Sequence, residues 1–374
     1  MTKVLVVTPG YPKDNNIYNN VFIHSRVKKY IENGIDVEVF YFDKENNTNY
    51  IYDDIFVEVG NHTRLKNKII RTNWDKILIH FAYKKFMKTI LEYRKDIKLI
   101  IWIHGVEGLG WYRRLFNISL KPIELIKFAG YILVNTKQML FMKKLITEEN
   151  ITFVFVSKWM KNIFEKDTKS INKIKDYKII PNVVNEKNFS YKEKKESDRL
   201  NILSIRPYES KKYANDISVK AVLKLAKKDF FKELSFSFFG KGKLFKSTLK
   251  PLKRFPNIHI YNKYLTAEEI KKEHDKHGII LIPTRQDAQG VSMCEAMSSG
   301  LVPITSNNTA IPEYVDKECG YLTNNVKEIV DAMEDIYLNP HKFLEMSKNS
   351  SKKIINKCSS KVVIDEELKL IMGD

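Results

Sequence analysis

The chain has 374 residues, 43% hydrophobic and 29% charged, with a net charge of +19, the composition of a soluble globular protein long enough for two domains. No apolar run approaches the ~20 residues of a membrane-spanning helix, and the first strand begins at once, without a signal-peptide pattern. Three widely spaced cysteines (Cys294, Cys319 and Cys358) exclude a disulfide framework and lack metal-ligand spacing, so we expect a cytoplasmic protein with buried thiols and no structural zinc.

The first half of the chain alternates short apolar runs with segments of helical periodicity. This alternation predicts a doubly wound α/β domain over residues 1–185. Amphipathic helices are expected at 22–33 and 84–93, and the polar stretch 186–199 is predicted to be a linker. The predicted strands are 3–8, 36–42, 76–80, 98–104, 131–135 and 152–156.

A second series of strands and helices begins at residue 200 and predicts a second Rossmann-like domain over 200–350. Because two such domains follow one another, we expect them to face a central cleft. The predicted strands of this series are 200–205, 234–239, 258–261, 278–282, 301–305 and 320–322.

The most informative stretch of the second series is PTRQDAQGVSMCEAMSSG, residues 283–300. It predicts a strand, a loop and a helix, and the loop lies at the carboxyl end of a parallel strand, where open α/β sheets bind ligands. The loop contributes Asp287 and the helix contributes Glu295. Gly290, Val291 and Ser292 are expected to offer free backbone N–H groups at the helix start, which favours an anion.

Asp287 and Glu295 are separated by seven residues, and a small-residue helix, a glycine and the strand LVPI follow. This pattern resembles the signature of retaining glycosyltransferases of family 4, of the polysaccharide-biosynthesis type, which have the GT-B fold. The resemblance implies an acceptor-binding first domain, a donor-binding second domain and a final helix, within 351–374, that returns to the first domain. It also implies that Glu295 binds the ribose of a nucleotide sugar and that Asp287, where the family more often has Glu, faces the transferred sugar.

Basic residues follow the first strand of the second domain. Arg206 and either Lys211 or Lys212 resemble the cation pair that holds the donor diphosphate in this family. Permanent cations suit a leaving diphosphate, which develops negative charge, so we expect no metal and no cofactor. The remaining donor-binding positions implied by the resemblance are Gly240, Gly242, Tyr264 and Leu265.

On the acceptor side, His104 and Glu107 end a predicted strand and resemble the HG-x-E pattern of a polysaccharide-making branch of the family. A histidine at this place can hydrogen-bond a sugar hydroxyl near the reaction centre. Asn20 stands near the start of the first helix, where relatives often have glycine, and is our third candidate for acceptor binding.

The positive charge is concentrated in residues 1–190, which hold 32 Lys and Arg against 20 Asp and Glu. Such a field suits a phosphorylated substrate, nucleic acid or an anionic membrane. The segment 109–126 mixes aromatic and basic side chains, which is typical of a helix at an anionic membrane surface. An ordinary amphipathic helix packed on the core would have the same pattern. Its candidate membrane contacts are Trp111, Arg113, Arg114, Phe116 and Lys121.

These patterns together predict a cytoplasmic, metal-independent hexosyltransferase that associates with the inner face of the plasma membrane. It would transfer a sugar with retention, from a nucleotide-diphosphate donor in which UDP is the expected nucleotide, to a lipid-linked or polymeric cell-envelope glycan. The alternatives are another GT-B enzyme, such as a nucleotide-sugar epimerase or a phosphorylase, and a basic nucleic-acid-binding protein. No nucleic-acid-binding motif is present, so we expect no nucleic acid as a partner.

Overall fold

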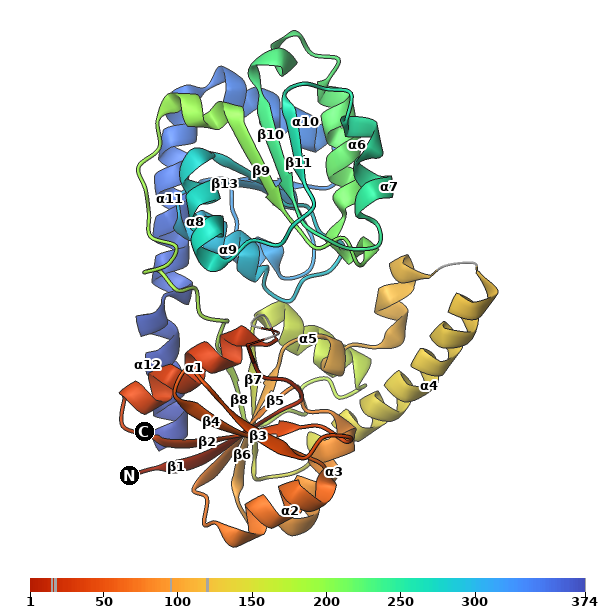
Figure 1. The fold of residues 1–374 in the computed structure, drawn as a ribbon, viewed down its shortest axis with the longest axis vertical. Helices are drawn as coiled ribbons and strands as arrows, with labels where there is room; N and C mark the ends of the chain where they lie inside the picture. The colour runs from red at the N-terminus through yellow and green to blue at the C-terminus, as the bar shows by residue number, and fades with distance from the viewer. Residues whose placement is uncertain (15, 17–18, 95, 119–120, 374) are drawn as a thin grey trace. The chain divides into compact units, whose positions relative to one another are not determined.

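The computed structural model describes residues 1–374 except 15, 17–18, 95, 119–120 and 374. The chain forms two compact units, one of residues 1–183 with 363–374 and one of residues 184–362. Each unit is a largely parallel sheet covered by helices (Figure 1).

The first unit contains an eight-stranded sheet in the order β3-β4-β2-β1-β5-β6-β7-β8. All neighbouring strands are parallel except β3 and β4, which form an antiparallel hairpin at one edge. The chain moves outward from β1 to β4 and then returns to β5, so the strand order reverses between β1 and β5, where such sheets bind ligands. The strands are β1 (Lys3–Thr8), β2 (Asp36–Phe42), β3 (Thr48–Tyr52), β4 (Ile55–Gly60), β5 (Lys76–His80), β6 (Lys98–Ile103), β7 (Ile151–Phe155) and β8 (Tyr177–Ile179).

The helices of this unit pack apolar residues on the sheet, whose central strands are buried on both faces and therefore read as continuous apolar runs. They are α1 (Val21–Glu32), α2 (His62–Arg71), α3 (Lys84–Tyr93), α4 (Pro122–Leu145), α5 (Lys158–Asp167) and α12 (Ser360–Met372), the last of which enters the unit at Val363, with the short turns η1 (Val106–Gly108) and η2 (Trp111–Asn117).

The second unit contains a six-stranded, fully parallel sheet in the order β11-β10-β9-β12-β13-β14, the strand order of a Rossmann fold. Its switch point lies between β9 and β12. The strands are β9 (Asn201–Ile205), β10 (Ser235–Phe239), β11 (Ile258–Tyr261), β12 (Ile279–Leu281), β13 (Val302–Ser306) and β14 (Tyr321–Thr323). The helices are α6 (Asn215–Leu225), α7 (Phe245–Leu249), α8 (Ala267–Lys276), α9 (Val291–Ser298), α10 (Val326–Leu338) and α11 (Pro340–Cys358), with short turns η3 (Glu196–Leu200), η4 (Lys211–Tyr213), η5 (Asp229–Glu233), η6 (Lys250–Leu252) and η7 (Ile311–Glu313).

One predicted strand is wrong. Residues 131–135 lie inside α4, and the hairpin of β3 and β4 and the short strand β8 were not predicted. The run Tyr-Ile-Leu-Val is apolar enough for a buried strand, but its four residues do not distinguish a strand from part of a helix. The remaining predicted strands have counterparts within one residue at each end.

The stretch 186–199, expected as a linker, belongs to the second unit. Its residues are held there by side chains and backbone of that unit. The Lys194 ammonium is buried and donates to the His274 carbonyl at 2.6 Å, and the Ser298 hydroxyl donates to the Phe189 carbonyl at 2.8 Å.

The C-terminal segment 351–374, expected as one helix, contains a break at Ser359, whose backbone is extended. Only residues 363–374 belong to the first unit. The buried Glu367 carboxylate anchors them, because it accepts hydrogen bonds from Arg26 Nε at 2.9 Å, the Tyr30 hydroxyl at 2.6 Å and Trp102 Nε1 at 3.2 Å. The three cysteines are free and buried, as predicted.

Candidate functional site

The predicted donor-binding residues lie at the carboxyl ends of four adjacent strands of the second unit. The sheet order β11-β10-β9-β12 places the loops that follow these strands side by side. These loops include 206–213 after β9, 240–242 after β10, 262–265 after β11 and 283–290 after β12. Because parallel strands point the same way, all four loops open at one edge of the sheet, around the switch point.

Arg206 follows β9 directly and is buried, with 4% of its surface exposed. Its Cζ lies 4.8 Å from the centre of the Tyr213 ring, whereas its Nε and Nη2 have no hydrogen-bond partner among the described residues. Burial lowers the pKa of Arg206, and the charge of Asp287 opposes this shift. A buried guanidinium with unused donors is unfavourable by itself, and an anionic ligand would supply the missing acceptors.

Lys212 reaches the same aromatic ring as Arg206. Its Nζ lies 5.5 Å from the centre of the Tyr213 ring, while Lys211 is exposed. The backbone of this turn is fixed by Arg285, which donates from its N–H to the Lys212 carbonyl at 2.8 Å and from Nη1 to the Lys211 carbonyl at 2.6 Å. Of the two predicted lysines, Lys212 therefore has the side chain that approaches the Tyr213 ring and the backbone that is tied to the β12 loop.

Gly240 and Gly242 are required by the loop after β9. Both have positive φ, and a Cβ on Gly240 would lie 2.0 Å from the Arg206 carbonyl oxygen, while one on Gly242 would lie 2.4 Å from the Tyr208 carbonyl carbon. The backbone of these two predicted donor-binding glycines thus packs closely against the neighbouring loop. The buried Tyr208 hydroxyl lacks a partner among the described residues, which identifies a polar group that the sequence analysis missed.

Asp287 organises the start of α9. Its Oδ1 accepts hydrogen bonds from the N–H groups of Gly290 at 2.8 Å and Gln289 at 3.3 Å. The Gly290 N–H is therefore not free, contrary to our expectation, because the carboxylate of the same loop satisfies it. The N–H groups of Val291 and Ser292 have no such partner in the described part of the chain, and Gly290, in the left-handed conformation with φ of 82°, cannot cap the helix with a side chain.

Glu295 carries a carboxylate without a partner among the described side chains. It lies in the second turn of α9, is half-buried, and no described side chain forms a hydrogen bond or ion pair with it. Burial raises the pKa of Glu295 to about 7. The group is thus poised to accept hydrogen bonds from a ligand, which would stabilise its charged form.

Tyr264 and Leu265 complete the predicted donor set. Tyr264 is exposed and lies beside the glycine loop, since Lys241 Nζ is 5.8 Å from the centre of its ring, and Leu265 is buried. The structure thus brings the loops that carry all predicted donor-binding residues to one edge of one sheet.

In the first unit, His104 is half-buried and directly follows β6, next to a second histidine that the sequence analysis did not select. His80 ends the neighbouring strand β5 and is fully buried, and its Nδ1 lies 3.0 Å from His104 Nε2. Burial is the main cause that holds the pKa of both rings well below 6.5. Both rings are therefore neutral at pH 7, and one ring donates an N–H hydrogen bond to the other.

The direction of this hydrogen bond follows from the burial of His80. Its Nε2 has no partner among the described residues, and a buried N–H without an acceptor is rarer than a buried unpaired lone pair. The favoured arrangement therefore has His80 Nδ1–H donating to His104 Nε2. His104 then carries its own hydrogen on Nδ1, which can be donated to an oxygen of a ligand.

Glu107 is fully buried, and its carboxylate accepts from the backbone N–H of His104 at 2.5 Å and of Gly105 at 3.1 Å. It thus holds the turn that carries His104, and it does not offer an exposed group to an acceptor as predicted. Burial raises the pKa of Glu107 to about 7, although the backbone N–H groups oppose this shift.

Asn20 is in the left-handed conformation, with φ of 55°, at the start of α1. Its side chain donates to the Gly10 carbonyl at 3.2 Å instead of capping the helix. The side chain of this predicted acceptor residue therefore closes the loop after β1. Residues 15 and 17–18 of that loop lie outside the described residues.

The predicted membrane segment is not one helix. It comprises η2 and the start of α4, with 119–120 outside the described residues. Arg113 forms a bidentate ion pair with the buried Asp167 carboxylate, at 2.6 Å from both Nε and Nη2, so its role is structural. The exposed aliphatic residues of this segment and of the rest of α4 are Leu115, Ile123, Leu125, Ile126, Leu133, Val134 and Leu140.

Comparison with solved structures identifies this arrangement. The structure of sucrose-phosphate synthase from Thermosynechococcus elongatus is similar to this chain, with a TM-score of 0.73 and 11% sequence identity. The alignment covers 100% of this chain and 99% of that one. HepE from Anabaena, solved with UDP and glucose, matches with a TM-score of 0.70 and 12% identity over 100% of both chains. The fold is GT-B.

A third GT-B structure is a variant of TarM from S. aureus in complex with Fondaparinux, alpha-GlcNAc-glycerol and UDP. It has a TM-score of 0.64 and 11% identity over 99% of this chain and 100% of that one. In sequence, residues 200–339 match the family model "Glycosyl transferases group 1". No curated protein sequence is significantly similar to the chain. The family match and the GT-B fold together support a glycosyltransferase.

Proposed function

We propose that the chain is a retaining glycosyltransferase of the family 4 type, with UDP as the donor nucleotide. It transfers a hexose to a hydroxyl of a lipid-linked or polymeric cell-envelope glycan. The observation that carries this proposal is the buried Arg206 at the switch point between β9 and β12, with two nitrogens that lack acceptors among the described residues. A diphosphate would supply those acceptors, and its developing charge would be stabilised without a metal.

The roles of the remaining donor residues follow from their chemistry. Lys212 adds a second cation beside the Tyr213 ring, and the backbone N–H groups of Val291 and Ser292 add donors at the start of α9. Glu295 accepts from two ribose hydroxyls, and Asp287 keeps the loop closed beside the sugar. As the bond to the sugar breaks, its electron pair leaves with the diphosphate. The acceptor oxygen bonds to the same face of the sugar, and the proton of the acceptor hydroxyl passes to the departing diphosphate.

His104 orients the sugar through its Nδ1–H, and His80 selects that tautomer. A second GT-B activity, epimerisation of the nucleotide sugar, would need no acceptor. We favour transfer because the strand ends β5 and β6 of the first unit also carry buried polar groups, as a second substrate site requires.

A lipid-linked acceptor places the enzyme at the cytoplasmic leaflet. No helix in the described part of the chain combines the length and apolar character needed to cross a bilayer. The support for peripheral binding is the run of exposed apolar residues on α4, together with the excess of basic residues in 1–190.

The test is to incubate the full chain with a panel of nucleotide-diphosphate sugars and a bacterial lipid extract, and to follow nucleotide release and the anomeric configuration of the product. We expect nucleotide release that depends on the extract and a product with the configuration of the donor. Release of an epimerised nucleotide sugar without extract, or an inverted product, would contradict the proposal.

A further inference from the structure

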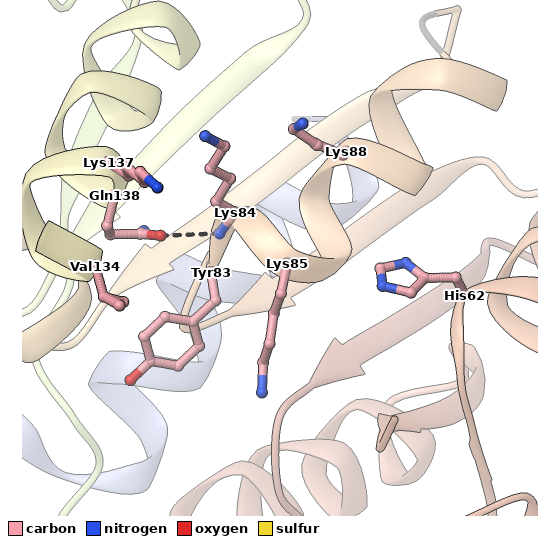
Figure 2. Close-up of a pocket in the computed structure, with 8 residues that line it drawn as sticks. All are labelled: His62, Tyr83, Lys84, Lys85, Lys88, Val134, Lys137 and Gln138. Carbon is pink, nitrogen blue, oxygen red and sulfur yellow. Dashed lines mark hydrogen bonds between the residues drawn. The ribbon is translucent and has the colours of Figure 1, made fainter. Parts of the chain in front are cut away.

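A groove lined by lysines lies in the first unit between α3 and α4 (Figure 2). It consists of a cavity of about 570 Å³ and a second of about 740 Å³, which share Lys84, Lys88 and Lys137. The first also contacts Lys85, and the second also contacts Lys143 and Lys144. No acidic side chain lines either cavity among the described residues.

The lysines of the first cavity, Lys84, Lys85, Lys88 and Lys137, form no ion pair within the described residues, although the charge of Asp43 acts on Lys85. Lys68 of the same unit, by contrast, contacts both Glu38 and Glu58. The positive field at the groove is therefore assigned to Lys84, Lys88 and Lys137, whose ammonium groups lie on one side of the pocket in Figure 2, while that of Lys85 points to the other side.

The start of α3 intensifies this field. Lys84 and Lys85 occupy its first turn, which has no acidic residue and no side-chain cap. A helix N-terminus already carries a partial positive charge, so lysines there are unfavourable unless an anion is bound. Lysines at this position do not stabilise the free protein, but they would stabilise a bound anionic ligand.

The groove is preformed. Gln138 of α4 is buried and holds three backbone groups: its Oε1 accepts from the Lys84 N–H at 2.9 Å, and its Nε2 donates to the carbonyls of Ala82 at 2.9 Å and Glu107 at 3.4 Å (Figure 2 shows the first). Glu107 in turn holds the His104 backbone. The groove and the candidate acceptor site therefore share one rigid frame.

The wall of the groove is mostly carbon, and it continues onto an apolar surface. Tyr83 and Val134 line the first cavity, and Leu133, Val134 and Leu140 of α4 are each at least 60% exposed. The Tyr83 ring stacks on Phe81 at 6.4 Å, and Phe81 lies 4.6 Å from the His104 ring. An occupant thus needs a strong anionic group, an adjoining hydrocarbon and a reach to His104.

We propose that the groove binds the phosphate or diphosphate of an amphiphilic acceptor, with its hydrocarbon on α4 and its sugar toward His104. This inference rests on the proposed function for the sugar, but binding of the anionic lipid does not depend on catalysis. It names the acceptor as a lipid phosphate and not as a neutral glycan.

The test is calorimetric titration of the full chain, in the presence of saturating UDP, with three probes: farnesyl diphosphate, inorganic pyrophosphate and farnesol. We expect farnesyl diphosphate to bind at least tenfold more tightly than pyrophosphate, and farnesol to give no measurable heat. Lys84→Glu/Lys137→Glu should weaken farnesyl diphosphate at least tenfold. Lys127→Glu/Lys166→Glu, the same charge change at two exposed lysines of the first unit outside the groove, should not.

A second variant protects the test against misfolding. Val134→Glu adds a negative charge at a 69% exposed position and should weaken farnesyl diphosphate severalfold while UDP affinity stays unchanged. Equal affinity for pyrophosphate and farnesyl diphosphate, or no effect of the lysine and valine variants, would overturn the proposal. If the wild-type chain binds farnesyl diphosphate but does not bind UDP, the proposed function is contradicted while the groove assignment stands.

Discussion

The two units are both doubly wound α/β sheets, but the charges at their switch points differ. At the switch point of the second unit, a buried cation lacks acceptors and a half-buried carboxylate lacks donors among the described side chains. At that of the first unit, two neutral histidines share one hydrogen bond among aromatic rings. In the proposed function, the second unit binds a charged nucleotide and the first binds neutral hydroxyls, and the proposed phosphate groove lies between α3 and α4 of the first unit.

The strongest way to break this comparison is to remove the cation of the second unit. Arg206→Ala should lower kcat/KM for the nucleotide sugar by about 100-fold or more, because charge-assisted hydrogen bonds contribute about 1.5–3 kcal/mol each. Its melting temperature should not fall, since the described residues leave donors of the buried guanidinium unused in the free protein. Arg254→Ala, at an exposed arginine of the same unit, is the matched control. Unchanged turnover in Arg206→Ala would refute the assignment.

The carboxylate of Glu295 predicts a pH dependence of nucleotide-sugar binding. With a pKa of about 7 in the free protein, Glu295 is mostly protonated at pH 6 and mostly charged at pH 8. Because ribose hydroxyls favour the charged form, UDP-glucose should bind about tenfold more tightly at pH 8 than at pH 6. The phosphates of this probe do not titrate in that range. Glu295→Gln should bind weakly and equally at both values, and a variant that kept the wild-type slope would show that another group is responsible.

The neutral histidine pair of the first unit predicts a different pH effect, on stability. The folded-state pKa of His80 lies below the unfolded value near 6.5, so stability is retained above pH 6.5 and lost as the pH falls below it. The loss should be about 1.4 kcal/mol per pH unit for each proton. His80→Phe should show a smaller slope in urea unfolding between pH 6.5 and 5. It should also lower kcat without changing UDP affinity. If the wild type and His80→Phe have the same pH slope of unfolding free energy and the same kcat, His80 has neither of these roles.

The smallest expected effect concerns membrane binding by the first unit. Ile126→Glu on α4 should weaken binding to anionic vesicles by about 1 kcal/mol, roughly fivefold, because a partly inserted isoleucine is lost. Ile51→Glu on the edge strand β3 exchanges an equally exposed isoleucine elsewhere and should have no effect. Vesicle flotation at two salt concentrations measures both. Equal behaviour of the two variants would indicate that α4 does not meet the membrane.

The contrast between the units also explains what the sequence could predict. The predicted donor residues lie in short loops after single strands or in the helix that follows, so a local motif was enough to nominate Arg206, Asp287 and Glu295, whose contact with a donor stays a prediction. His80 was missed because its meaning depends on β5 lying beside β6, which becomes visible only when the sheet is assembled.

Roles within the predicted set required side-chain directions. Asp287 and Glu107 each turn back to bind backbone N–H groups, and Arg113 pairs with Asp167, 54 residues away. No spacing in the sequence signals these contacts. The helix α4 was missed at 131–135 for a related reason: its apolar residues are exposed, so the pattern of a buried strand and that of a surface-binding helix coincide.

The most direct measurement of the central claim is a calorimetric titration of UDP into the full chain in EDTA. The account predicts binding at one site per chain, unchanged by added magnesium and weakened at least tenfold in Arg206→Ala. Binding that appears only with magnesium, or that is the same in Arg206→Ala, would contradict the claim that buried basic residues of the second unit hold the diphosphate.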